Sequence, residues 1–216
     1  ETVLRAILGA TLGESANVTV VDLSGVPFEV LSLTVSLLSR LIFDVAYHLK
    51  RARVESHADD EPQTPFLLVY EEAHKYVPTA ADSRYNACRK AIERIAKEGR
   101  KYGATLGIIS QRPSEISETI FSQCNNFIAM RLTNPADQAY VERLLPDSLG
   151  QMIRTLPTLP QGDALLIGDA VVMPAQVTIE RCNPEPSSSD IRYIEEWKRE
   201  WLDPAVEHVV RRWLAR

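Results

Sequence analysis

Short apolar runs alternate with longer amphipathic stretches along most of the chain. Runs rich in β-branched and aromatic residues, each followed by polar or turn-forming residues, predict buried strands at residues 18–25, 66–70, 104–110 and 126–132. The stretches after these runs predict helices at residues 29–49, 83–103, 115–121 and 134–145. Regular alternation of strands and helices predicts an α/β fold, with a mostly parallel sheet covered on both faces.

The helix predicted at residues 29–49 is long enough to cross a bilayer. However, Arg40 and Asp44 lie inside it, and charged side chains are costly in lipid. Apolar residues from Leu31 to Leu49 recur at alternating spacings of four and three, which places them on one helix face. We therefore expect a core helix and no membrane association.

The C-terminal part of the chain changes in character. Residues 163–179 predict a β-hairpin around the turn Gly168-Asp169, and a Pro- and Ser-containing stretch follows. The last residues predict two short amphipathic helices separated at Asp203-Pro204, with Trp197, Trp201 and Trp213 as packing residues. We therefore expect a core at residues 1–182, a linker at 183–189 and a helical tail at 190–216.

Composition restricts the function only loosely. The 216 residues are 45% hydrophobic and 25% charged, with a net charge of −5, so the whole chain has no basic footprint for nucleic acid. Its three cysteines have no CxxC spacing, which argues against a disulfide framework or a zinc site and favours the cytoplasm. The chain opens on Glu1 without a signal-peptide pattern, so we expect either processing or part of a longer protein.

Two adjacent acids, Glu71 and Glu72, directly follow the apolar run FLLVY. Acids also suit the N-terminus of a following helix, so the pair alone does not indicate chemistry. In parallel sheets, however, ligands bind at the carboxyl ends of strands, and this rule places Gln111 and the turn after Leu132 at the same edge. Clustered polar groups there favour a site that hydrolyses a nucleotide.

Other interpretations of these residues compete. His74 and the two acids could form a metal site, but His48, His57 and His208 show no spacing that would supply another ligand. Arg131 and Arg154 are further candidates for contacts with phosphate or with a neighbouring subunit.

Three segments together resemble a known family: LLVYEEAH, EGRKYGATLGIISQRPSEIS and FIAMRLTNPAD. In this order they resemble the RecA-like P-loop NTPase core of the HerA/FtsK superfamily, and the HerA ATPases most closely. The resemblance extends from about Val18 to Ile179, and the block from Glu98 to Ser117 is its most specific part. The motif EEAH also resembles that of two-lobed DExH helicases, but no second motor lobe is visible.

The resemblance implies roles for individual residues. Glu71 takes the place of the Walker B aspartate, which holds Mg²⁺ through water, and Glu72 that of the catalytic glutamate, which polarises the attacking water. Gln111 matches the sensor glutamine that contacts the γ-phosphate of ATP. Arg100, eleven residues earlier, matches an arginine finger that reaches the nucleotide of a neighbouring subunit. Without the resemblance, Arg100 would be read as part of a solvated helix face.

The chain departs from the family pattern in two ways. Glu71 is Glu where Asp is usual, which lengthens the side chain by one methylene. No G-x-x-x-x-G-K-[ST] phosphate loop occurs, and the glycine-bearing stretch LGATLGES, Leu8 to Ser15, lacks the lysine. We expect the phosphate loop either upstream of Glu1 or absent.

The resemblance implies an ATP-driven DNA translocase or helicase motor, a hexamer that hydrolyses ATP at its subunit interfaces and acts on double-stranded DNA. Its expected partners are a NurA-like nuclease, or a sirtuin-type or other effector subunit in antiviral defence. The alternative is a ring-forming scaffold that organises an effector enzyme, with ATP turnover secondary. The sequence does not decide between them.

Overall fold

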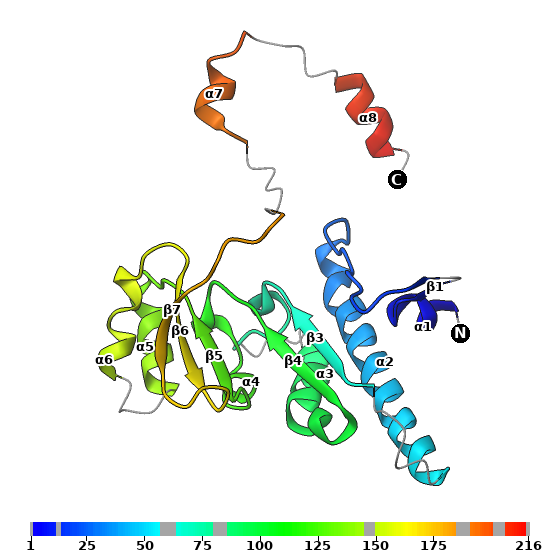
Figure 1. Cartoon of the computed structure of the whole chain (residues 1–216). Helices are drawn as coiled ribbons and strands as arrows, with labels where there is room; N and C mark the ends of the chain where they lie inside the picture. The colour runs from blue at the N-terminus through cyan, green and yellow to red at the C-terminus, as the bar shows by residue number, and fades with distance from the viewer. Residues whose placement is uncertain are drawn as a thin grey trace. The chain divides into compact units, whose positions relative to one another are not determined.

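The computed structural model describes residues 2–11, 14–56, 64–79, 86–144, 150–184, 191–200 and 206–214. The chain divides into two compact units, Glu1–Ile179 and Glu180–Arg216 (Figure 1). The first unit combines helices with small sheets, one of them parallel. The predicted boundaries at residues 182 and 190 remain a prediction.

A pair of parallel strands lies at the centre of the first unit. Strands β3 (Phe66–Tyr70) and β4 (Ala104–Ile108) pair in register, with Phe66 opposite Ala104 and Tyr70 opposite Ile108. The crossover between them contains α3 (Asn86–Glu98) and the 3-10 helix η3 (Gly99–Tyr102), so both strands and this helix confirm the sequence prediction. Residues 83–85, where the helix was expected to begin, lie outside the described residues.

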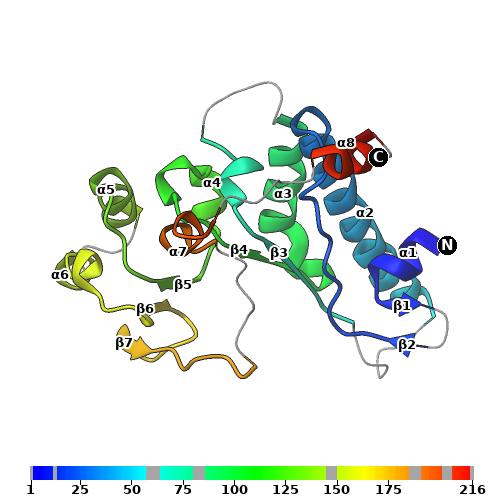
Figure 2. The same ribbon diagram turned by 90° about the horizontal axis from the view of Figure 1, so that it is seen from above.

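One face of this sheet is covered and the other is not. Leu68 and Ala104 are buried against Ile95 of α3 and against Phe43 and Ala46 of the long helix α2 (Phe28–Glu55). Figure 2 shows α2 and α3 beside the two strands. Side chains that point to the opposite face of β3 are open to solvent, with Leu67 65% and Val69 55% exposed, as strand alternation requires.

Helix α2 covers and extends the predicted segment at residues 29–49. The Ser39 hydroxyl joins it to β3 through a hydrogen bond of 2.7 Å with the Tyr70 hydroxyl. Leu33 and Leu37, in contrast, are each 56% exposed. Among the described residues, α2 is the one helix whose length and apolar composition would allow it to cross a membrane, a test that core helices also pass.

A second sheet is antiparallel, contrary to our expectation for its first strand. Strand β5 (Asn126–Ala129) pairs with β6 (Asp163–Gly168), which in turn pairs with β7 (Ala175–Thr178). The segment at residues 126–132 was predicted as a parallel strand, but the hairpin of β6 and β7 supplies its hydrogen-bonding partner instead. The hairpin itself confirms the prediction for residues 163–179, although the connection is longer than a two-residue turn.

The strand predicted at residues 18–25 does not form. These residues have no regular secondary structure, and Val18 and Val20 are 77% and 85% exposed. A strand needs a neighbour to satisfy its backbone N–H and C=O groups, and no described strand pairs with this segment. The prediction was therefore wrong about both the strand and its burial.

The remaining elements of the first unit are short. The helix predicted at residues 115–121 is divided, because Ile116 between its two parts has an extended backbone. The helix predicted at 134–145 is confirmed. The bounds are α1 (Thr2–Ile7), β1 (Ala10–Thr11), β2 (Glu14–Ser15), η1 (Ala73–Lys75), η4 (Pro113–Glu115), α4 (Glu118–Phe121), α5 (Pro135–Leu144), α6 (Gly150–Ile153) and η6 (Leu156–Thr158).

The second unit contains the helices α7 (Tyr193–Trp197) and α8 (Val206–Leu214). All of its described side chains in these helices are exposed, including Trp197 at 79% and Trp213 at 76%. Trp201, the break at Asp203-Pro204 and most of the predicted linker lie outside the described residues.

Candidate active site

The ends of β3 and β4 bring together three of the residues predicted from the sequence. Glu71 and Glu72 follow Tyr70, the last residue of β3, and Gln111 follows β4 after two further residues. Backbone hydrogen bonds of 2.9 Å continue the pairing beyond the strands, from Ile109 N–H to the Tyr70 carbonyl and from Ala73 N–H to the Ile109 carbonyl. The acids and Gln111 therefore occupy the same edge of the sheet.

The backbone of Glu72 has an unusual conformation. Its φ and ψ angles are 51° and 43°, in the left-handed region, and it is the one non-glycine residue with positive φ in the part of the chain that the structure describes. Such a conformation strains a residue with a Cβ atom and persists only where the surroundings impose it. The turn that redirects the chain from β3 into η1 therefore fixes the direction of the Cα–Cβ bond of Glu72.

The carboxylates at this edge remain accessible. Glu71 is exposed, and the Glu72 side chain is 35% exposed. Gln111 is exposed as well. Behind them, the pKa of Tyr76 is raised by burial and, to a smaller extent, by the nearby carboxylates of Glu71 and Glu72. Two accessible acids and an amide at one edge can contact a polar ligand and a water molecule at the same time.

Sequence reasoning did not find Ser110 at this edge, and it considered His74 only as a candidate metal ligand. His74 Nδ1 lies 3.1 Å from Ser110 Oγ, and His74 Nε2 lies 3.4 Å from Glu72 Oε2. Ser110 Oγ also accepts a hydrogen bond of 3.0 Å from the Arg112 N–H, so it closes the turn that carries Gln111. The only available signal was the presence of polar residues at two strand ends.

Arg100 is not part of this group. It is the second residue of η3, on the far side of Gly103, which has a φ of 78° and leads into the first residue of β4. The length of the five-residue strand, about 16 Å at 3.3 Å per residue, separates that end of β4 from the end near Gln111. Arg100 is exposed and has no ion-pair partner among the described residues.

The structure gives no specific support to Arg131 or Arg154 as residues that contact phosphate or a neighbouring subunit. Arg131 is exposed shortly after β5. Arg154 lies 3.8 Å from the Glu142 carboxylate with its side chain 78% exposed, as in an ordinary surface ion pair.

The residues at this edge do not form a metal centre by themselves. No group of three His, Cys, Asp or Glu side chains that could hold an ion occurs in the described ranges. His74 faces Ser110 rather than a second histidine. Glu71, an exposed carboxylate, fits Mg²⁺ held through water, because Mg²⁺ keeps several of its waters and takes few protein ligands.

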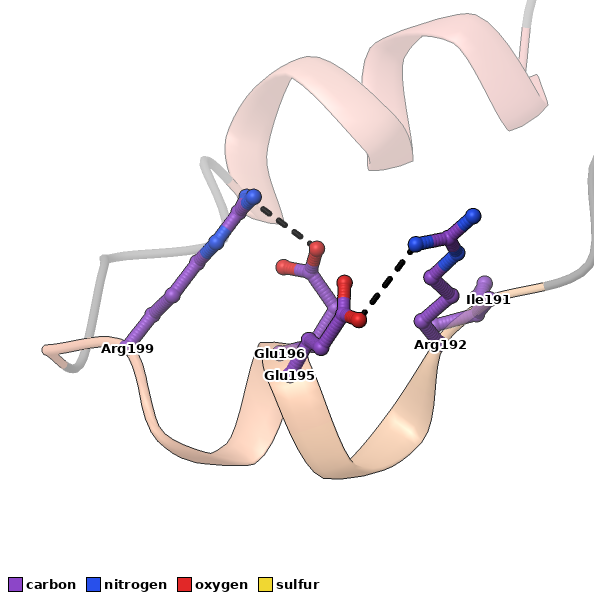
Figure 3. A pocket seen from close by; sticks show the side chains of 5 residues that line it. All are labelled: Ile191, Arg192, Glu195, Glu196 and Arg199. Atoms are coloured by element: carbon purple, nitrogen blue, oxygen red, sulfur yellow. Dashed lines mark hydrogen bonds and ion pairs between the residues drawn. The ribbon is translucent and has the colours of Figure 1, made fainter.

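The second unit contains a separate hollow (Figure 3). Its charged side chains neutralise one another, since Arg192 pairs with Glu195 at 3.3 Å and Arg199 with Glu196 at 3.1 Å. These side chains are 45% to 79% exposed, and exposed ion pairs of this kind are common on helix surfaces. The hollow has no unpaired group that indicates a ligand.

Comparison with curated proteins identifies clear relatives. The chain is 39% identical over 135 residues to the DNA double-strand break repair helicase HerA of Sulfurisphaera tokodaii, covering 62% of this chain and 27% of that protein. It is 34% identical over 174 residues to HerA of Sulfolobus acidocaldarius, with 78% and 34% covered. It is 31% identical over 182 residues to HerA of Saccharolobus solfataricus, with 84% and 35% covered.

The chain is homologous to part of the HerA helicases. It spans about a third of the length of these HerA relatives or less. No family model matches it. Among solved structures, the genome packaging NTPase B204 of Sulfolobus turreted icosahedral virus 2 is 14% identical, with a TM-score of 0.46 over 55% of this chain and 54% of that one. That similarity is too low to indicate a function.

Proposed function

We propose that this chain forms part of an ATP-driven DNA motor of the HerA type, in a RecA-like P-loop NTPase core. The observation that supports this most directly is the meeting of Glu71, Glu72 and Gln111 at the carboxyl ends of two adjacent parallel strands. The strongest independent support is homology to proteins named as DNA double-strand break repair helicases.

In this proposal, Glu72 is the base that polarises the attacking water. Its carboxylate is partly exposed, and its backbone is held in one conformation, so it can accept a proton from a water molecule with little reorganisation. Gln111 donates a hydrogen bond to the γ-phosphate from the neighbouring strand end. The products are ADP and inorganic phosphate.

Glu71 is the residue that holds Mg²⁺, through water. When bound, the ion neutralises negative charge on the phosphate oxygens. The phosphate loop that such a site also requires is absent from the 216 residues, so Glu71 supplies only part of the ion's surroundings.

Arg100 serves a neighbouring subunit. It lies at the opposite end of β4 from Gln111 and is exposed, so it is free to project from the flank of one subunit towards the nucleotide of the next. This arrangement requires head-to-tail contacts in a closed ring, which we propose to be a hexamer around double-stranded DNA in the cytoplasm. A nuclease of the NurA kind, or a defence effector, would complete the assembly.

The test is ATP hydrolysis by the full-length gene product, with and without duplex DNA. We expect Glu72→Gln, which keeps the shape but removes the charge, to reduce turnover by about a hundredfold or more while ATP still binds. The matched control is Glu55→Gln, an exposed residue at the far end of α2. Turnover that is equally low in wild type and Glu72→Gln, with the ring intact, would favour the scaffold instead.

A further inference from the structure

The side chain of His74 connects the two strand ends that carry the proposed catalytic residues. It begins from η1, two residues after Glu72, and it is only 15% exposed. One ring nitrogen faces the hydroxyl of Ser110 after β4, at 3.1 Å, and the other faces the Glu72 carboxylate after β3, at 3.4 Å.

One consistent set of hydrogen bonds runs along this connection. The Arg112 N–H donates to Ser110 Oγ, and the Ser110 hydroxyl keeps its own hydrogen for donation to His74 Nδ1. With the ring hydrogen on Nε2, the imidazole can also donate to Glu72 Oε2. At 3.4 Å this last contact is longer than a good hydrogen bond, as is common for catalytic groups before the substrate binds.

Gln111 lies in the turn that this connection holds at one end. Gln111 is the residue between Ser110 and Arg112, at the exposed tip of the turn that Ser110 closes. Arg112 also forms a surface ion pair of 2.9 Å with Glu115, in which the side chains are 60% and 47% exposed. Gln111 is therefore bonded directly to Ser110, whose hydroxyl lies 3.1 Å from the His74 ring.

We propose that His74 is a positioning residue that transmits the state of the Gln111 turn to the Glu72 carboxylate. When a ligand binds Gln111, it shifts the turn that contains Ser110. The Ser110 hydroxyl then displaces the imidazole, so that Nε2 comes within hydrogen-bond distance of Glu72. This hydrogen bond then holds the Glu72 carboxylate in one orientation, in addition to the constraint from the Glu72 backbone. This inference rests on the proposed ATP hydrolysis, since it assigns His74 no chemistry of its own.

The test compares variants of the full-length gene product. His74→Phe keeps a ring but has no nitrogen, and Ser110→Ala removes the hydroxyl. We expect each to lower kcat for ATP by roughly 10- to 100-fold, the loss typical of a misplaced catalytic group, with KM changed less than about twofold. Ser110→Thr restores the hydroxyl and should return kcat to near the wild-type value. Because the residues act as one connection, the double variant should be no slower than the slower single variant.

A purely structural role predicts different results. If His74 only stabilised the fold, thermal stability and ATP affinity would fall together with kcat, and Ser110→Thr would not recover activity selectively. Wild-type kcat in both His74→Phe and Ser110→Ala, while Glu72→Gln is inactive, would overturn this inference and leave the proposed function standing. Absence of ATP hydrolysis by the wild-type protein would overturn both.

Discussion

Cys88 and Cys182 have the same side chain in opposite surroundings. Cys88 is fully buried on α3, in the cluster with Val35 and Val77, and burial raises the pKa of its thiol to about 12. Cys182, after the second sheet, is exposed. Since the thiolate is the reactive form, access and pKa both protect Cys88 from alkylation.

We predict that iodoacetamide at pH 8 labels Cys182 within minutes and leaves Cys88 unlabelled while the protein is folded. Cys124, half-buried and with its pKa also raised by burial, should react slowly. Peptide mass spectrometry would give the order, and labelling in urea, where all three thiols react, is the control. Equal rates for Cys88 and Cys182 in the folded protein would contradict the packing of α3.

At the residue scale, the candidate site was partly readable from the sequence. Glu71, Glu72 and Gln111 could be found because the strand-end rule needs only the identity and order of the strands. The contact between His74 and Ser110 could not, because it joins residues 36 positions apart and depends on the register of β3 and β4. Side-chain contacts between strand ends follow from that register rather than from local patterns.

At the scale of elements, features set by local sequence patterns were predicted correctly, whereas features set by strand pairing were not. Most helices and strands from β3 to α5 have strong local patterns and form close to where they were expected, although the helix predicted at residues 115–121 is divided. Whether β5 pairs parallel or antiparallel, and whether residues 18–25 form a strand, depends on which other segment supplies the neighbouring backbone. Local sequence patterns do not contain that information. Strand pairing is therefore where the fold prediction failed.

The junction between α3 and β4 depends on close backbone approach at Gly99. A Cβ atom placed on this buried residue would lie 2.4 Å from the carbonyl oxygen of Ala104, a backbone atom that cannot move by itself. The same addition at Gly25 would meet no atom within 4 Å. The two positions therefore form a matched pair for testing how tightly this junction is packed.

We predict that Gly99→Ala destabilises the protein by about 1–3 kcal/mol, the usual cost of overpacking. Gly25→Ala should change the free energy of unfolding by no more than about 0.5 kcal/mol. Urea unfolding followed by circular dichroism measures both. If the two variants unfold at the same urea concentration, the approach of Gly99 to Ala104 is looser than described.

At the scale of the whole molecule, the separation of Arg100 from the acids is the informative feature. A residue that lies a strand's length from its own subunit's Glu72 and Gln111 is poorly placed to act on the same nucleotide. The proposed ring resolves this by placing the arginine of one subunit beside the acids of the next.

If Arg100 is an arginine finger, as proposed, Arg100→Ala should lower ATP turnover by about a thousandfold while ATP binding and ring size are unchanged. Lys97→Ala, a nearby exposed lysine on α3, is the control and should stay active. Mixing inactive Arg100→Ala with inactive Glu72→Gln should restore partial turnover, since some interfaces then pair an intact Arg100 with an intact Glu72. Contact between Arg100 and its own subunit's nucleotide in a liganded structure would refute the proposal.

The left-handed backbone of Glu72 creates a trade-off between stability and activity. A non-glycine residue in that region costs about 1–2 kcal/mol, which glycine would not. Replacement of Glu72 by glycine should therefore make the protein more resistant to heat while removing the proposed base. A library selected for thermal resistance alone would enrich that substitution and recover proteins that are better folded and inactive. Engineering of this chain for durability has to hold position 72 constant.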